Sequence, residues 1–351
     1  MENNRKCPLC HNDLDTNTSF CYHCKQFIDP VCNQVCPADQ VSDEQLEQLI
    51  RIHDQARKKW NGSAGQIRMI LGTCLMLAGV GALLFLMDKM SLLILIPICA
   101  VPVILGALIV VKAPQKPQQI LNIPDYSEIL SHTLIPGILQ DCMAPIEAYE
   151  PDQGISEARI RETSPFVQKW DRCSGNHRIA GTWNSRKTEL CNLILEKEDE
   201  RPQDNDKEKT RYIPVFNGVW MIIQTDRTRN ADLMIIPRNQ DNNYTQNSIV
   251  EMDNELFNEQ FCVQCTDRHE AFYTLTPVMI EKIMETAQKV QGQLWIRMMK
   301  DGRVVFAVHT GQQEIFKVHE LHEKPAQIRK RFTEELKNTL NFCESILQKL
   351  K

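Results

Sequence analysis

The sequence predicts a multi-domain chain: a small four-cysteine module, a two-helix transmembrane hairpin, and an α+β cytoplasmic domain with mainly antiparallel strands and a long C-terminal amphipathic helix. Three observations predict this organisation: cysteines at metal-ligand spacing near the start, two uncharged apolar runs after them, and a long tract that mixes helical and alternating patterns. We place the module at residues 1–30, a linker with a juxtamembrane helix at 31–67, the hairpin at 68–112 and the α+β domain at 120–351.

Residues 1–30 contain the most specific chemical pattern, in which Cys7-Pro8-Leu9-Cys10 is followed by Cys21-Tyr22-His23-Cys24. Four thiolates favour tetrahedral zinc with Zn–S distances of about 2.3 Å, and they leave no coordination position open for catalysis. We therefore predict a structural Zn²⁺ bound by Cys7, Cys10, Cys21 and Cys24, with a dithiol redox pair as the alternative. So short a segment has little apolar core, so the metal is expected to supply most of its folding free energy.

The same segment resembles the short bacterial zinc-ribbon module, whose pattern is Cys-Pro-x-Cys-Gly, a polar stretch, and then Phe-Cys-x-x-Cys-Gly. Phe20 and both cysteine pairs match this pattern, whereas His11 and Lys25 replace the glycine that follows each pair. The sequence leaves open which further side chains contribute to metal binding, the candidates being His11, His23, Cys32 and Cys36. For the last two, spare thiols are the favoured interpretation.

Two apolar runs, residues 69–87 and 91–111, contain no charged side chain and are separated only by Asp88, Lys89 and Met90. Each run has about 20 residues, so as a helix rising ~1.5 Å per residue it matches the ~30 Å hydrocarbon core of a bilayer. Basic residues flank both outer ends of the pair. The positive-inside rule then predicts a multi-pass protein of the cell inner membrane with both termini in the cytoplasm. A buried hairpin of a soluble protein is the alternative.

Composition is typical of a chain in a reducing compartment. Several of the fourteen cysteines are at metal-ligand spacing and others fall singly in apolar segments, which does not suit a disulfide framework. The net charge of -5 excludes a polyanion binder by bulk electrostatics. The module has only Arg5, Lys6 and Lys25 as bases among several aspartates, so no nucleic acid is expected as a partner.

In the linker before the hairpin, Ser42 and Gln45 are placed as a capping box at the start of a helix.

The tract after the hairpin has the pattern of a helix followed by mixed strands and helices. Residues 125–142 have helical periodicity that is broken near Pro136. Strands are expected over 177–183, 189–195, 212–224, 232–236 and 261–265, with an exposed loop at 196–211. Thr276 and Pro277 open a further helix; 294–299 and 303–309 form a hairpin about Gly302; and 326–350 forms the last helix.

Four segments of this tract resemble an uncharacterised bacterial membrane family, the domain of unknown function DUF3137. They are Phe216-Asn217-Gly218-Val219, Phe257-Asn258-Glu259-Gln260-Phe261, Cys265-Thr266-Asp267 and Ala271-Phe272-Tyr273-Thr274-Leu275-Thr276-Pro277. The resemblance covers roughly residues 120–320 and the hairpin. It implies a cytoplasm-facing membrane protein without an assigned activity, and so provides no catalytic residues. We interpret the motif residues as structural: Gly218 allows a bend and the aromatic residues, Tyr273 included, fill the core.

No catalytic constellation stands out in the same tract. Cys262 and Cys265 lie three apart on a predicted strand, so they point to opposite faces, and we expect one buried and one surface thiol. We interpret residues 267–270 as a solvated loop. His319 and His322 are expected on a surface stretch. No phosphate-binding loop or serine elbow is found in the sequence.

These features favour a non-enzymatic, membrane-anchored interaction protein that faces the cytoplasm and contains a structural zinc site. Its expected partners are the lipid bilayer and proteins at the cytoplasmic membrane face, and oligomerisation is left open. The alternative is a membrane-tethered enzyme with an unrecognised active site in residues 120–320. The sequence does not identify the biological process, the partners or a substrate.

Overall fold

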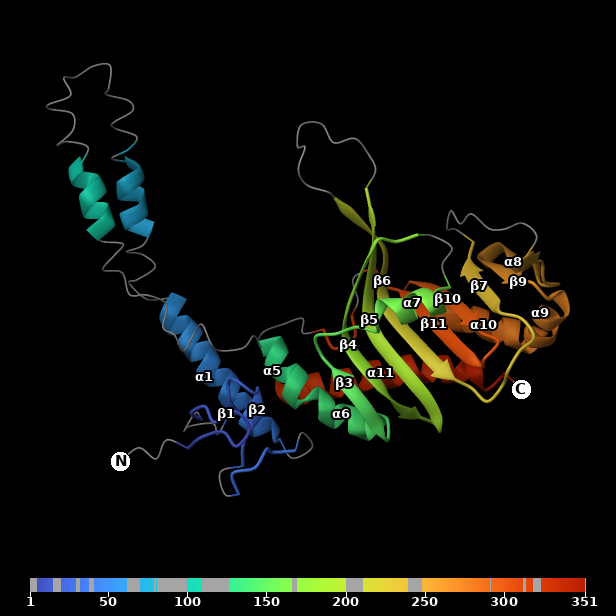
Figure 1. Cartoon of the computed structure of the whole chain (residues 1–351), viewed down its shortest axis with the longest axis horizontal. Coiled ribbons are helices and arrows are strands. Elements are labelled where there is room, and N and C mark those ends of the chain that lie inside the picture. Colours follow the sequence, from blue (N-terminus) through green and yellow to red (C-terminus); the bar gives the residue numbers. More distant parts are fainter. Residues whose placement is uncertain are drawn as a thin grey trace, which may run out of the picture. The chain divides into compact units, whose positions relative to one another are not determined.

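The chain forms two compact units, Met1–Ile129 and Leu130–Lys351 (Figure 1). The computed structural model describes residues 5–14, 20–29, 32–37, 41–61, 70–78, 80, 100–108, 126–165, 169–199, 211–238, 248–290, 292–311, 314–317 and 323–350.

The first unit contains a two-stranded antiparallel ribbon, β1 (Phe20–Cys21) and β2 (Gln26–Phe27), and the helix α1 (Asp43–Asn61), which runs beside it (Figure 1). The predicted capping box is confirmed. Ser42 N–H donates to Gln45 Oε1 at 3.0 Å, and Gln45 N–H donates to Ser42 Oγ at 3.2 Å. The rings of Phe20 and Phe27 meet edge to face with centroids 5.0 Å apart, and both are buried.

Two leucines of α1, Leu46 and Leu49, are also completely buried. Together with the phenylalanine pair of the ribbon, they give the first unit apolar side chains in addition to its cysteines. Burying a leucine or phenylalanine fully contributes roughly 1.5–3 kcal/mol. The helix that follows the ribbon therefore adds to the stability of the first unit.

The predicted transmembrane hairpin is not supported, because no helix within the described residues is long and apolar enough to cross a bilayer. The described helical parts of the two predicted spans cover residues 70–78 and 100–108. At ~1.5 Å per residue, each reaches about half of a ~30 Å hydrocarbon core. The other positions of 69–87 and 91–111, residue 80 apart, lie outside the described residues. The same finding contradicts the prediction of a multi-pass inner-membrane protein with both termini in the cytoplasm.

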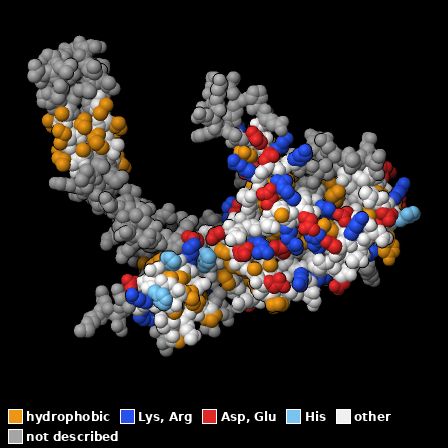
Figure 2. Space-filling view, in the orientation of Figure 1, with side chains coloured by type: hydrophobic (Ala, Val, Ile, Leu, Met, Phe, Trp, Pro, Cys, Tyr) orange, Lys and Arg blue, Asp and Glu red, His pale blue; other side chains and the backbone are white. Residues whose placement is uncertain are grey.

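The helical residues 70–78 and 100–108 lie side by side and pack closely (Figure 1). A Cβ at Gly106 would come within 2.6 Å of the Gly72 carbonyl oxygen and 2.7 Å of Met76 Cγ, so only glycine fits this contact. Large hydrophobic side chains of both segments are exposed (Figure 2). The packing of the two segments thus depends on backbone contact at a small residue.

The second unit is built on one nine-stranded antiparallel sheet in the order β3-β4-β5-β6-β11-β10-β7-β9-β8. The strands are β3 (Ile146–Glu150), β4 (Arg172–Trp183), β5 (Arg186–Glu198), β6 (Tyr212–Gln224), β7 (Leu233–Pro237), β8 (Ile249–Val250), β9 (Phe261–Cys265), β10 (Gln293–Met298) and β11 (Arg303–His309). The sheet is therefore assembled from hairpins and longer connections, without a parallel pair among the described strands.

Helices cover both faces of this sheet (Figure 1). The helices that follow α1 and lie wholly or partly in this unit are α5 (Tyr126–Thr133), which crosses the boundary between the two units, α6 (Ile135–Cys142), α7 (Glu157–Thr163), α8 (Glu255–Gln260), α9 (Arg268–Thr274), α10 (Pro277–Lys289) and α11 (Pro325–Leu347). On one face, Ile160 of α7 and Trp170 pack with Trp220 and Trp295 of the sheet. On the other, Phe306 of β11 meets Phe342 of α11 with ring centroids 6.2 Å apart.

Several predicted elements are confirmed at residue level. The strands over 212–224 and 261–265 and the hairpin about Gly302, whose φ is +86°, are present. Thr276 caps α10 by accepting a hydrogen bond from Met279 N–H at 3.3 Å. The helix break near Pro136 is also present, between α5 and α6.

Other expectations for the second unit are wrong. Tyr273 does not fill the core, because 71% of it is exposed, whereas Leu275 two residues later is buried. Cys265 is buried like Cys262, since side chains on both faces of β9 are covered.

Residues 268–270 belong to α9, which Asp267 caps through the backbone N–H groups of His269 and Glu270. The strand β3 and the helices α7 and α8 were not predicted. His319 and His322 lie outside the described residues.

Gly218 permits a close approach between β6 and β11 rather than a bend. A Cβ at this position would lie 1.9 Å from the Val308 carbonyl oxygen, which belongs to the paired strand and cannot move independently. We expect Gly218→Ala to destabilise the second unit by about 3 kcal/mol or more, as a severe case of overpacking. Urea unfolding followed by the fluorescence of the buried tryptophans measures this loss.

Gly311→Ala is the matched control, because no atom lies within 4 Å of its added Cβ and only the backbone strain at φ +80° remains. That strain is worth about 1–2 kcal/mol. Equal losses for the two variants would contradict the steric explanation at Gly218.

Candidate metal centre

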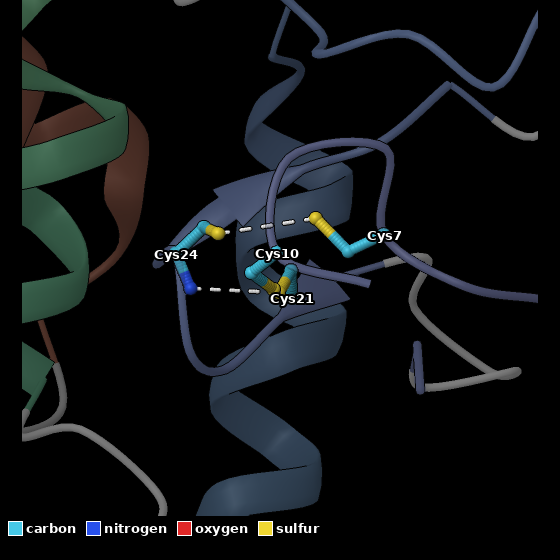
Figure 3. A group of neighbouring side chains, drawn as sticks. All are labelled: Cys7, Cys10, Cys21 and Cys24. Carbon is cyan, nitrogen blue, oxygen red and sulfur yellow. Dashed lines mark hydrogen bonds between the residues drawn. The ribbon is translucent and has the colours of Figure 1, made fainter. Parts of the chain in front are cut away.

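The structure brings the four predicted cysteines together in the first unit (Figure 3). Their sulfur atoms all lie within 4.8 Å of one another, with Cys7 and Cys21 buried and Cys10 and Cys24 half-buried. The closest partners come from different Cys-x-x-Cys pairs. Cys7 Sγ lies 3.8 Å from Cys24 Sγ, and Cys10 Sγ lies 3.5 Å from Cys21 Sγ.

These distances fit a metal site and are too long for a disulfide. A disulfide requires an S–S bond of about 2.05 Å, and every described cysteine has a free thiol. Four sulfurs placed tetrahedrally at ~2.3 Å from an ion are separated by about 3.8 Å along each edge. The cluster therefore has the dimensions of one four-coordinate metal ion, and its donor set of four sulfurs fits such an ion. Leu14 and Ile28 pack against the cysteines and exclude water from one side.

The local chain conformation explains how the cysteines converge. In each pair the residue after the second cysteine, His11 or Lys25, has a left-handed backbone with φ of +59°. Its N–H donates to the carbonyl of the first cysteine, from His11 to Cys7 at 2.9 Å and from Lys25 to Cys21 at 2.7 Å. Each turn thus points two thiols to the same side. The replacement of glycine at these positions does not prevent the turn.

The same hydrogen-bond pattern occurs a third time in the first unit. Asn33 has a φ of +54°, and its N–H donates to the Asp29 carbonyl at 3.0 Å. The Cys32 N–H donates to Asp29 Oδ1 at 3.2 Å, as the Cys24 N–H donates to Cys21 Sγ at 3.4 Å. Asp29 therefore takes the place of the first cysteine in a third turn.

The thiols of the cluster differ in acidity. A hydrogen bond from the Asn12 backbone N–H lowers the pKa of Cys10 to about 6, so this thiol is ionised at neutral pH. Burial raises the pKa of Cys21 and of Cys24 above the ordinary value. A metal ion that binds here would therefore displace protons from Cys21 and Cys24, whereas Cys10 would provide a thiolate in advance.

The further candidate ligands lie outside the cluster. His11, His23 and Cys32 are exposed and Cys36 is half-buried, and none belongs to the group of converging donor atoms. Cys262 and Cys265, on β9 of the second unit, also remain apart from any group of metal-ligating side chains in the described part of the chain. Burial raises the pKa of both thiols, which makes them poor ligands and poor nucleophiles.

The second unit has a separate concave feature that the sequence did not predict. A cavity of about 620 Å³ lies between α10 and α11, over the face of β6 and β11. Its lining residues are dispersed between positions 219 and 345, so no local motif marks it. The available signal was a stripe of polar residues on α11, Glu335, Asn338 and Ser345, beside the apolar stripe that faces the sheet.

A four-cysteine cluster that could hold a metal ion and an antiparallel α+β unit thus define the class of protein. Residues 214–351 match the model of a family described as a protein of unknown function, DUF3137. This match confirms the predicted resemblance to that family for the part from β6 to α11, and it does not extend to residues 120–213 or the predicted hairpin.

No curated protein matches the chain. Among solved structures, the crystal structure of the mycobacterial trehalose monomycolate transport factor A, TtfA, is similar with 8% sequence identity and a TM-score of 0.30. The alignment covers 54% of this chain and 88% of that chain. A similarity of this strength supports no inference about fold or function.

The left-handed backbone at His11 generates a testable prediction. The left-handed conformation costs an L-residue other than glycine about 1–2 kcal/mol. Glycine avoids this cost but loses roughly 0.5–1 kcal/mol more conformational entropy on folding, so the net gain is about half of the strain. We expect His11→Gly to stabilise the turn by about 0.5–1 kcal/mol, measured as slower hydrogen exchange of the amides in residues 5–29.

His23→Gly is the matched control, since His23 is equally exposed but does not have a positive φ. It should accelerate exchange slightly. Acceleration by both substitutions would show that strain at His11 is not significant.

Proposed function

We propose that the first unit binds one structural Zn²⁺ through Cys7, Cys10, Cys21 and Cys24, and that the chain is a non-enzymatic protein that acts by binding other proteins. The observation that carries this proposal is the convergence of the four thiols with sulfur separations of 3.5 and 3.8 Å. Thiolates favour zinc among the common cellular divalent ions, and a tetrahedral set of four suits its coordination.

The closed donor set supports a structural role for the ion. Four protein ligands leave no position for a water molecule or substrate, so the metal stabilises a surface and performs no chemistry itself. The segment that holds the four cysteines is short, so metal-binding free energy is also folding free energy there, and it complements the burial of Phe20, Phe27 and the α1 leucines. The product is a rigid module suited to recognition.

Charge distribution favours proteins over nucleic acids as partners. On the face of the second unit in Figure 2, lysine and arginine side chains alternate with aspartate and glutamate. In the second unit as a whole, basic and acidic side chains form ion pairs, such as Arg178 with Glu150 at 2.8 Å and Arg297 with Asp232 at 2.7 Å. A surface of mixed sign lacks the extended positive field that attracts phosphate backbones.

Metal content tests the zinc site directly. The purified full chain should contain one Zn²⁺, and Co²⁺ loading should give the intense visible bands of a tetrahedral all-thiolate site. Cys21→Ser should abolish stoichiometric binding, because it removes one of four ligands. Cys32→Ser and Cys36→Ser are the controls and should retain one ion per chain. Retention of full zinc content by Cys21→Ser would exclude the proposed ligand set.

The acidities of the thiols predict how zinc affinity depends on pH. Above pH 6 the Cys10 thiol, with a pKa of about 6, is already ionised, while the raised pKa values of Cys21 and Cys24 keep these thiols protonated. Zinc binding should then release protons, so the affinity should rise with pH, and the rise should be steeper below pH 6, where Cys10 also binds a proton. Calorimetry in buffers of different ionisation enthalpy counts these protons. A pH-independent affinity would contradict this assignment.

A further inference from the structure

The cavity of the second unit is a groove with an apolar floor and polar walls. Val219 of β6 and Val308 of β11 form its floor, and Phe342 of α11 adds an aromatic side. The helices α10 and α11 meet where Thr286 Oγ1 lies 3.3 Å from Ser345 Oγ. The volume of about 620 Å³ is in the range of sites that bind small molecules or short chain segments.

The walls carry hydrogen-bonding groups that the protein does not use. Asn338 and Asn341 line the groove from α11. Within the part of the chain that the structure describes, their side-chain amides have no hydrogen-bond partner. A hydrocarbon chain placed here would remove these amides from water without replacing their hydrogen bonds, which is costly. A peptide backbone offers both a donor and an acceptor to each amide.

The groove is lined by charges of both signs, of which Glu335 is already paired with Arg331 at 2.9 Å. On the α10 wall, Lys282 and Lys289 both pair with the single carboxylate of Glu285, at 2.8 and 2.5 Å, which leaves one positive charge in excess. Glu314, which also lines the groove and lies outside α10 and α11, has no ion-pair partner among the described residues. A ligand with an acidic and a basic end therefore matches the groove in charge.

We propose that this groove binds a short extended peptide segment of a partner protein, with an aliphatic side chain on the floor, an acidic residue toward Lys282 and Lys289, and a basic residue toward Glu314. This proposal rests on the proposed interaction function and specifies where and how a partner is recognised. It requires no contribution from the zinc module.

A synthetic peptide, acetyl-Glu-Leu-Leu-Lys-amide, tests the proposal by calorimetry with the full chain. We expect saturable binding with a Kd below about 1 mM, the weak range suited to a transient contact. Replacing both leucines of the probe with serine should weaken binding at least tenfold, because the floor then loses its apolar contact. Decanoate serves as a competing probe, and its binding in preference to the peptide would overturn the proposal in favour of an amphiphile site.

Variants of the protein locate the binding. Asn338→Trp fills the groove from an exposed helix position and should weaken peptide binding at least tenfold, whereas Lys330→Trp, exposed on α11 outside the groove, should leave it unchanged. Lys289→Glu should also weaken binding. Thermal unfolding confirms that each variant is folded.

Absence of binding to the wild-type chain, or equal binding by Asn338→Trp, overturns the proposal. Cys10→Ser should bind the peptide normally, so a failure of the zinc site is distinguishable from a failure of the groove.

Discussion

The antiparallel pairing of β6 with β11 holds the second unit together. In the strand order, β3, β4, β5 and β6 lie on one side of this pairing and β11, β10, β7, β9 and β8 on the other, so it joins two groups of strands that are otherwise separate. The chain between β6 and β11 forms most of the second group. Gly218 lies opposite His309 at the end of the pairing, where the backbones are too close for any side chain.

The same strand pair determines what each face of the sheet contains. Successive side chains of β6 alternate between the faces, so Phe216 and Trp220 join the tryptophan-rich core while Val219 points to the side of α10 and α11. On β11, Phe306 contacts α11 and Val308 lines the groove. The core and the groove therefore share one register. A slip of one residue would exchange their side chains.

Features encoded by neighbouring residues could be predicted from the sequence. The cap at Thr276, the turn at Gly302 and the cysteine pairs each depend on positions within a few residues of one another. The exposure of Tyr273 and the burial of Cys265 could not be predicted, because they depend on which distant segments cover α9 and β9. The sequence did not show that the thiols associate crosswise, Cys7 with Cys24 and Cys10 with Cys21. The hairpin prediction was based on the apolar composition of the two runs and on their length of about 20 residues, whereas no helix among the described residues is long and apolar enough to cross a bilayer.

The third turn, from Asp29 to Asn33, shows what the two cysteine turns require. It has the same backbone hydrogen bond and left-handed residue, with an aspartate oxygen as the side-chain acceptor in place of sulfur. This geometry is therefore a property of the polypeptide and not of an ion. A metal that binds the first two turns finds donor pairs that are already oriented, so less conformational entropy is lost on binding. Four ligands in two preorganised pairs behave as two bidentate chelators, which a single ion would bridge.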